Sequence, residues 1–363
     1  MGDFTLVAVV VTALFFDFTN GFHDSANAIA TSVSTRALTP RVAVLISAVL
    51  NFAGAFVSIK VAATIAKGIV NPDAITLNIV LAGLVGAITW NLLTWLLGLP
   101  SSSSHALIGG VAGAAIAAEG WDVVEWNGLW NKVVKPSVLA PVLGFFGALL
   151  LMLVIVWLIR RRSPSKVNRG ARIGQIFSGS FVAFTHGTND AQKTMGVISL
   201  ALIASGHLQA EPFTVPTWVI VSSATAMAIG TYAGGWRIIK TLGTRIAKID
   251  PPQGFAAQTT CGAILWTTAH FGFPVSTTQT ITGSVMGAGA SRRLSAVRWP
   301  VAGNIVTAWI LTLPAAGLVG ALMEAVTRLP GGDFIVFVLA GVIAATAFTA
   351  RRYETRRLAP ATA

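Results

Sequence analysis

Long apolar segments recur along the whole chain and are separated by short polar or basic stretches. They cover residues 4–16, 42–61, 75–97, 138–159, 176–203, 219–236, 255–271, 301–323 and 334–348. Most are about 17 to 25 residues long, the length at which an α-helix crosses the hydrocarbon core of a bilayer. Membrane β-strands are much shorter, at about 9 to 11 residues, so the length favours helices. The pattern predicts an all-α polytopic membrane protein with about 10 to 12 membrane segments, counting helical hairpins.

The composition supports this class. Of 363 residues, 54% are hydrophobic and only 10% are charged, and the mean hydropathy is +0.73. The net charge of +12 does not indicate a nucleic-acid partner, because the basic residues lie between apolar segments and not along one face. The single cysteine, Cys261, excludes an internal disulfide and a cysteine metal cluster.

Basic residues are concentrated in five of the polar stretches: residues 36–41, 160–172, 237–248, 292–298 and 351–357. Because cytoplasmic loops carry an excess of Lys and Arg, we expect all five on the cytoplasmic side of a plasma (cell inner) membrane. The acidic connections then lie outside, although Lys60, Lys67, Lys132, Lys135 and Arg328 share that side. The chain would begin outside the cell and end in the cytoplasm.

This orientation divides the chain into two halves of opposite direction. Residues 1–159 form a first repeat that starts outside, and residues 160–172 form a basic cytoplasmic linker. Residues 173–329 form a second repeat that starts inside, and residues 330–363 form a final transmembrane helix with a basic cytoplasmic tail. The two repeats are therefore predicted to be inverted, an arrangement typical of secondary transporters.

A polar motif is repeated at matching places of the two halves. The segment FTNGFHDSAN at residues 18–27 returns as FTHGTNDAQK at residues 184–193. Lipid offers no hydrogen-bond partners, so polar, glycine-containing segments in membrane helices predict interrupted helices that line a central cavity.

The two motifs carry the candidate coupling residues. A carboxylate at membrane depth needs a compensating cation. We predict that Asp24, Asn27, Asp190, Asn189 and His23 couple transport to a cation or a proton, with Asp24, Asn27 and Asp190 as oxygen ligands for Na⁺ or another metal ion.

Lys193 aligns with Asn27, so its ammonium would neutralise Asp190 or help to hold an anion, and this favours proton coupling. Alternatively, Asp190 and Lys193 form only a packing ion pair at helical spacing. Among the other histidines, His105 is the next candidate for proton handling, and His186 is interpreted as a core histidine. Asp17 either faces the outer cavity or caps unwound backbone.

A second repeated motif supplies hydroxyl groups. GLPSSSSH at residues 98–105 is echoed by GFPVSTTQ at residues 272–279. Proline opens a helix well, and the free N–H groups and positive dipole at a helix start suit an oxyanion. We predict that these motifs form the tips of hairpins 75–118 and 255–290, re-entrant in our preferred version. The candidate anion-binding residues are Ser101, Ser102, Ser103, Ser104, Gln192, Lys193, Ser276, Thr277, Thr278 and Gln279. The alternative is that the small hydroxyl residues only help helices to pack.

With these motifs the chain resembles the inorganic phosphate transporter (PiT) family, over both halves. The resemblance implies inverted repeats, usually a homodimer, and uptake of inorganic phosphate driven by Na⁺ or H⁺, with bacterial proton-coupled members accepting neutral metal phosphate. The first signature departs from the family's commoner Gly-Ala-Asn-Asp form by carrying Phe22-His23 between Gly21 and Asp24. The family's binding residues would correspond to Asp24, Asn27, Ser102, Ser103, Asp190, Gln192, Ser276, Thr277 and Thr278.

The resulting prediction is a secondary phosphate transporter in the lipid bilayer that works by symport, with H⁺ favoured over Na⁺ and no cofactor besides the coupling ion. A Na⁺-coupled phosphate or sulfate transporter of the same scaffold is the alternative. An intramembrane hydrolase with Ser103 or Ser104 and His105 is disfavoured, because adjacent helical residues point about 100° apart. A passive channel is disfavoured because the carboxylates belong to one central site.

Overall fold

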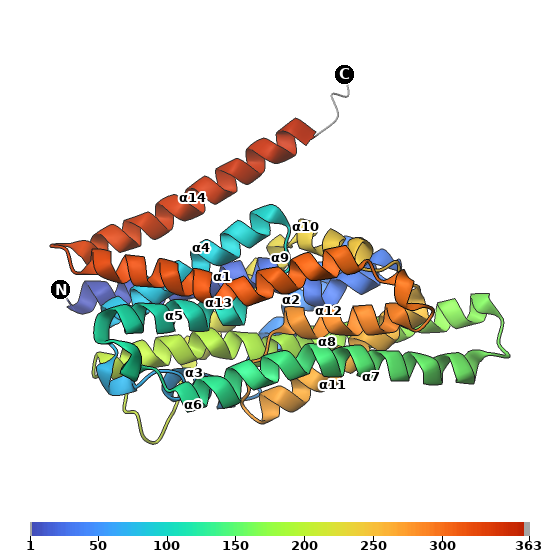
Figure 1. The fold of residues 1–363 in the computed structure, drawn as a ribbon, viewed down its shortest axis with the longest axis horizontal. Helices are drawn as coiled ribbons and strands as arrows, with labels where there is room; N and C mark the ends of the chain where they lie inside the picture. Colours follow the sequence, from blue (N-terminus) through green and yellow to red (C-terminus); the bar gives the residue numbers. More distant parts are fainter. Residues whose placement is uncertain (1, 359–363) are drawn as a thin grey trace.

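The computed structural model describes residues 2–358, and its regular elements there are helices (Figure 1). The longer helices are α1 (Gly2–Ser34), α2 (Pro40–Gly54), α4 (Leu77–Leu97), α5 (Ser103–Glu119), α7 (Lys135–Ile159), α8 (Pro164–Ala204), α9 (Thr217–Ala233), α11 (Pro251–His270), α12 (Thr277–Ala290), α13 (Trp299–Thr327) and α14 (Gly332–Leu358). Short helices α3 (Lys60–Lys67), α6 (Trp126–Gly128) and α10 (Trp236–Lys240) and several single turns connect them. Within residues 2–358 these eleven longer helices agree with the predicted all-α fold of about 10 to 12 segments.

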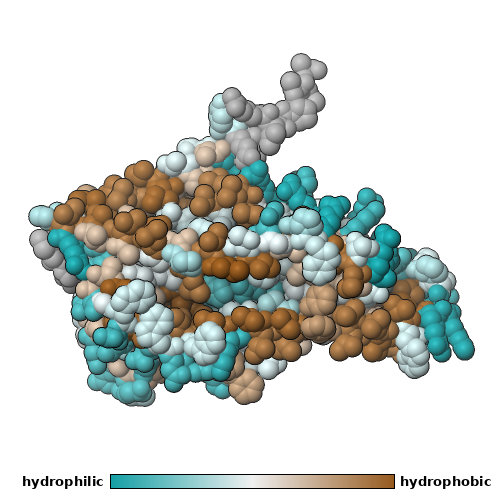
Figure 2. Space-filling model, viewed as in Figure 1, coloured by the Kyte–Doolittle hydropathy of each residue, from teal (hydrophilic) through white to brown (hydrophobic). Residues whose placement is uncertain are grey.

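Five stretches are long and apolar enough to cross a membrane by length and hydropathy: Phe4–Ser34, Leu77–Leu97, Trp126–Ile159, Trp299–Thr327 and Gly332–Tyr353. The outer helices α7, α13 and α14 expose large apolar side chains, among them Leu143, Phe146, Leu150, Ile310, Leu318, Val338 and Val342. Figure 2 shows apolar residues over much of this face and hydrophilic residues gathered toward the two ends of the long axis. The chain is a multi-pass membrane protein, as the sequence predicts.

Helices of one half pack mainly against helices of the other half. Helix α1 lies against α9, and α8 lies against α2. The hairpin α4–α5 packs on α13, and the hairpin α11–α12 packs on α7. Helix α14 lies outside, against α4 and α13 (Figure 1). The halves are therefore interlocked, and their shared interior is lined by α1, α8 and the two hairpins.

Local details recur in the two halves. Antiparallel bridges pair Val70 with Val124 and Ala247 with Val297. The backbone N–H groups of Glu125 and Arg298 donate to Ile69 and Ile246, each at 2.9 Å. The indoles of Trp126 and Trp299 each donate to a carbonyl five residues earlier, at 3.1 Å. The two halves thus repeat one structure.

The proposed boundaries of the repeats remain predictions. Helix α8 already begins at Pro164, so most of the predicted linker 160–172 is helical. The end of the predicted basic tail, residues 359–363, lies outside the described residues.

The helices are not interrupted at the acidic motifs, and this part of the prediction is wrong. Helix α1 continues through residues 18–27 and α8 through residues 184–193. The motif glycines instead allow backbones to approach: a Cβ on Gly21 would lie 2.4 Å from the carbonyl oxygen of Met227, and one on Gly187 would lie 2.1 Å from that of Asn51. The chain breaks at the hydroxyl motifs, where Gly98 and Gly272 take left-handed conformations with φ of 66° and 75°. The broken elements are therefore the two hairpins.

This packing predicts that Gly187→Ala destabilises the protein. In an unhindered helix, alanine is favoured over glycine by about 1 kcal/mol, whereas the Cβ at this site collides with the α2 backbone and overpacking costs about 1–3 kcal/mol. The measurement is thermal unfolding of the purified protein in detergent. Gly303→Ala is the matched control, because Gly303 is exposed and its Cβ would meet no atom within 4 Å. Equal unfolding temperatures for the two variants would contradict the packing role.

Candidate functional site

Each hairpin tip is a short connection that ends in a capped helix start. In the first tip the Ser102 hydroxyl accepts a hydrogen bond from the His105 backbone N–H at 3.1 Å, and α5 begins at Ser103. In the second tip the Ser276 hydroxyl accepts from the Gln279 N–H at 3.3 Å, and α12 begins at Thr277. The first N–H groups of a helix have no partner within it. Each tip therefore offers free backbone donors and a positive helix end.

The two tips meet inside the protein. The Ser104 hydroxyl of the first tip donates to the Val275 carbonyl of the second at 3.3 Å, and Gln279 Nε2 lies 3.4 Å from His105 Nδ1. Ser101, Ser102, Ser103, Ser104, Ser276, Thr277, Thr278 and Gln279 are all buried. Two helix N-termini, one from each half, thus converge on one buried region, which is the arrangement expected for oxyanion binding.

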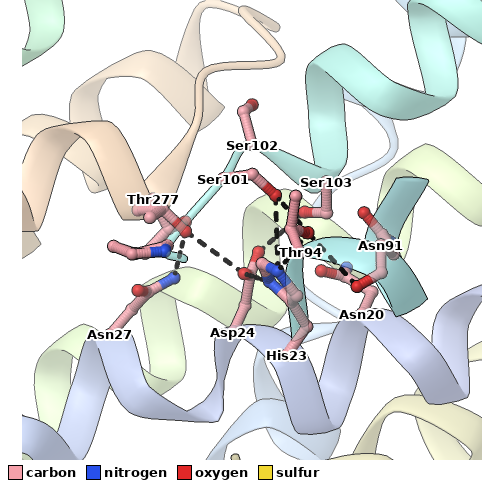
Figure 3. A network of polar contacts seen from close by, with 12 residues as sticks. Asn20, His23, Asp24, Asn27, Asn91, Thr94, Ser101, Ser102, Ser103 and Thr277 are labelled. Atoms are coloured by element: carbon pink, nitrogen blue, oxygen red, sulfur yellow. Dashed lines mark hydrogen bonds and ion pairs between the residues drawn. The ribbon is translucent and has the colours of Figure 1, made fainter. Parts of the chain in front are cut away.

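Asp24 receives hydroxyl donors from both tips (Figure 3). Ser103 donates to one carboxylate oxygen at 2.7 Å and Thr278 donates to the other at 3.1 Å. His23 Nδ1 lies 2.7 Å from the same oxygen as Thr278. Asn27 Nδ2 donates to the Thr278 hydroxyl at 2.9 Å. Helix α1 thus connects directly to both hairpins.

On the far side of His23, a small hydroxyl network holds the ring. His23 Nε2 lies 3.2 Å from the Thr94 hydroxyl and 3.4 Å from that of Ser101, which are themselves 2.8 Å apart. In Figure 3 Ser101 and Ser103 point toward the His23–Asp24 pair, whereas the Ser102 hydroxyl points away from it. Ser102 serves here as a helix cap, directly before the first residue of α5.

Asp190 is neutralised by a neighbour on its own helix. Lys193 Nζ donates to one of its carboxylate oxygens at 2.5 Å, and the Thr277 hydroxyl donates to the same oxygen at 3.4 Å. The other oxygen lies 3.4 Å from both Asn20 Nδ2 and His186 Nε2. Both hairpin tips therefore connect to an acid residue, and the two acidic motifs share one site.

The two acid clusters lie close enough to share a cation. Asp24, His186 and Asp190 each place one possible ligand atom within 4.8 Å of the other two, and all three side chains are buried. Carboxylates and an imidazole together suit a divalent cation. The sequence led us to treat His186 as a core histidine, so its place between the carboxylates was missed. The available signal was its i, i+4 spacing from Asp190 on one helix face.

Three other candidates occupy structural positions at the edge of this site. The Gln192 side-chain carbonyl accepts the backbone N–H of Val61 at 2.8 Å, which ties α3 to α8. Asn189 Nδ2 donates to the Phe273 carbonyl at 3.4 Å. His105 Nε2 lies 2.7 Å from the Ser137 hydroxyl, and its other ring nitrogen faces Gln279. A serine–histidine pair of Ser103 or Ser104 with His105 is therefore not formed.

Asp17 is a further buried carboxylate on this face of α1. Residues 17, 20, 24 and 27 have the spacing of one helical face. Asp17 is 0% exposed and its oxygens have no hydrogen-bond partner among the described residues; Thr194 and Asn20 are its polar neighbours. It does not cap unwound backbone, because α1 is continuous here.

A bundle of membrane helices whose two halves bring helix ends and buried carboxylates to one central site has the architecture of a secondary transporter. The model of the phosphate transporter family matches residues 20–170 and 160–320. The chain belongs to this family, as its motifs predicted.

Several curated relatives are similar over most of their length, and each is described as a "probable low-affinity inorganic phosphate transporter". The Mycobacterium tuberculosis (strain CDC 1551 / Oshkosh) protein is 56% identical over 333 residues, covering 91% of this chain and 79% of the relative. Those of Rhizobium meliloti (strain 1021) and Bacillus subtilis (strain 168) are 50% and 45% identical, each covering 87% of this chain and 95% of the relative.

A solved structure described as "the sodium-dependent phosphate transporter" resembles the fold. Its TM-score is 0.78 at 24% sequence identity, and the match covers 89% of this chain and 99% of that one. At this identity the likeness supports the fold alone.

Proposed function

We propose that this protein imports inorganic phosphate by proton symport, with phosphate held between the two hydroxyl tips and Asp24 and Asp190 carrying or balancing the coupling charge. The observation that supports this most is that Ser103, Thr277 and Thr278, which come from two capped helix starts, all donate to these two carboxylates. The same hydroxyl and backbone donors would turn to a phosphate oxygen when it enters.

Electrostatic repulsion would couple phosphate binding to the binding of a proton or a cation at this site. A phosphate anion about 4 Å from an ionised carboxylate is repelled by about 4 kcal/mol at an effective dielectric constant of about 20. That repulsion would weaken phosphate binding by about a thousandfold. Phosphate therefore binds well only when Asp24 has taken up a proton or a cation, and this mutual requirement is what couples the two movements.

Two features favour a proton over Na⁺. Lys193 already supplies Asp190 with a cation at 2.5 Å. His23 Nδ1 lies 2.7 Å from Asp24, which places a second proton-binding side chain within hydrogen-bond distance of this carboxylate. A Na⁺-coupled phosphate or sulfate transporter remains the alternative on this scaffold, and sulfate is distinguished because it has no proton to donate to a carboxylate at neutral pH.

We further propose that the N-terminus faces outside and the C-terminus faces the cytoplasm of the plasma membrane, as the basic connections indicate. The resemblance to the family adds a homodimer. The orientation can be tested by labelling single introduced cysteines in cells. The homodimer can be tested by measuring the mass of the purified protein in detergent.

The test of the function is uptake of labelled phosphate into proteoliposomes, with pH and Na⁺ gradients imposed separately and sulfate as competitor. We expect an inward proton gradient to drive uptake, a Na⁺ gradient to have little effect and sulfate to compete weakly. Asp24→Asn should abolish gradient-driven uptake, because its amide cannot bind and release a proton. Wild-type rates in this variant would remove Asp24 from the coupling mechanism. Thermal unfolding in detergent shows whether it remains folded.

The cluster of Asp24, His186 and Asp190 favours a second candidate function, transport of phosphate as a neutral complex with a divalent metal. With the metal as part of the cargo, these residues would hold the cation while the hydroxyl tips hold the phosphate. A metal between the carboxylates and phosphate would convert the repulsion estimated above into attraction.

His186→Gln tests this candidate. The variant keeps a hydrogen-bonding side chain toward Asp190 but lacks the imidazole ligand. Mn²⁺-dependent phosphate uptake should therefore fall by at least about 10-fold, the smallest loss seen when a residue that only supports a metal ligand is removed. His207→Gln is the matched control, because His207 is exposed and contacts Ser205. If uptake by His186→Gln and wild type responds equally to Mn²⁺, then the imidazole is not a ligand.

A further inference from the structure

The ammonium group of Lys193 is enclosed by oxygen atoms. It donates to Asp190 Oδ1 and to the Ser104 hydroxyl, each at 2.5 Å, and to the Val275 backbone carbonyl at 3.2 Å. The side chain is 1% exposed. An ammonium has three N–H donors, and all three directions are used. A carboxylate, a hydroxyl and a backbone carbonyl are also the ligands that a small hard cation prefers.

The first half contains the equivalent place without the lysine. By the repeat of the acidic motif, Asn27 corresponds to Lys193 and Asp24 to Asp190; by the repeat of the tip motif, Thr278 corresponds to Ser104. One contact is equivalent: Asn27 Nδ2 donates to Thr278 at 2.9 Å, as Lys193 donates to Ser104. Thr278 also donates to Asp24 at 3.1 Å, whereas Ser104 donates to the Val275 carbonyl. The protein therefore has two related oxygen-lined positions, one of which holds a side-chain cation.

An unsatisfied atom indicates a ligand in the first position. Asn27 is 0% exposed, and its side-chain carbonyl oxygen has no hydrogen-bond partner among the described residues. A buried amide oxygen without a partner is unfavourable unless something else binds it. The nitrogen of the same amide donates to the Thr278 hydroxyl, which in turn donates to Asp24. A cation or a proton donor that enters next to Asp24 would supply the partner that this oxygen lacks.

From this pair of positions we infer that Lys193 is a built-in cation: its ammonium occupies in the second half the place that a mobile coupling cation occupies in the first. The inference rests on the proposed function and extends it to stoichiometry, because each transport cycle then needs one mobile cation fewer than a protein with two open positions. Lys193 is thereby the residue that determines how many cations accompany each phosphate. An ordinary packing ion pair would have no such effect on transport.

Lys193→Asn tests the inference by giving the second half the same residue as the first. Phosphate uptake into proteoliposomes is measured against Na⁺ concentration at equal pH on both sides, with an impermeant organic cation keeping ionic strength constant. Na⁺ is the cation tested because Asn189 stands where the first half has His23, so the opened position lacks the adjacent histidine that favours a proton beside Asp24. The steepness of Na⁺ activation should therefore rise by one Na⁺ relative to wild type, whatever the wild-type value is. Saturating Na⁺ should stimulate the variant by at least about fivefold, the lower end of ordinary coupling between two bound ligands.

Lys193→Met is the matched control, because it also removes the ammonium but supplies no oxygen ligand; its uptake should stay low at every Na⁺ concentration. A folded Lys193→Asn variant with the wild-type Na⁺ response, or one that is inactive at every Na⁺ concentration, would overturn the inference. So would Na⁺ activation that is equal in the Asn and Met variants.

A binding measurement keeps the test independent of transport. Na⁺ should raise the thermal unfolding temperature of Lys193→Asn in detergent more than that of Lys193→Met or wild type, since a ligand stabilises the state that binds it. Recovery of folded Lys193→Asn protein only in the presence of Na⁺ would support the inference. Failure to recover folded variant in either Na⁺ or K⁺ would refute the inference. If the wild-type protein takes up no phosphate, the proposed function is refuted. The effect of Na⁺ on the unfolding temperature of Lys193→Asn would then still test the inference about Lys193.

Discussion

The need to keep Asp24 and Asp190 buried within membrane helices is the constraint on which the rest of the structure depends. An uncompensated charge at the centre of a bilayer costs at least about 2.5 kcal/mol on insertion scales. The protein compensates for the two acids differently. Asp190 has a permanent ammonium from Lys193, whereas Asp24 has only neutral hydroxyl donors and a histidine. Under the proposed function, this asymmetry would leave Asp24 free to take up and release a charge.

The interlocking of the halves explains how such a site could open alternately. Asp24 lies on α1 of the first half, yet it accepts a hydroxyl from each tip, Ser103 of the first half and Thr278 of the second. Movement of one half against the other would therefore change the environment of Asp24 directly. Close backbone contacts at Gly21 and Gly187 join α1 and α8 to the opposite halves. The glycine contacts would make α1 move together with α9, and α8 together with α2.

Much of this could be predicted from the sequence, and the failures have a common cause. Segment length predicted membrane helices, and the two repeated motifs predicted convergence of the tips. The roles of Gly21 and Gly187 were misjudged because the sequence does not show whether a glycine breaks its own helix or allows the backbone of another helix to approach. His186 was missed for the same reason: its importance depends on the distance to Asp24 on another helix. Ser102 could have been identified as a cap from its place directly before a helix.

The most direct test of the central claim is an experimental structure of the protein with phosphate bound, determined in lipid nanodiscs. The account predicts phosphate between the two tips, with its oxygens within hydrogen-bond distance of the Ser103 and Thr277 hydroxyls and of the first backbone N–H groups of α5 and α12. Phosphate bound away from the tips, or tips separated from Asp24 and Asp190 in every state observed, would contradict it.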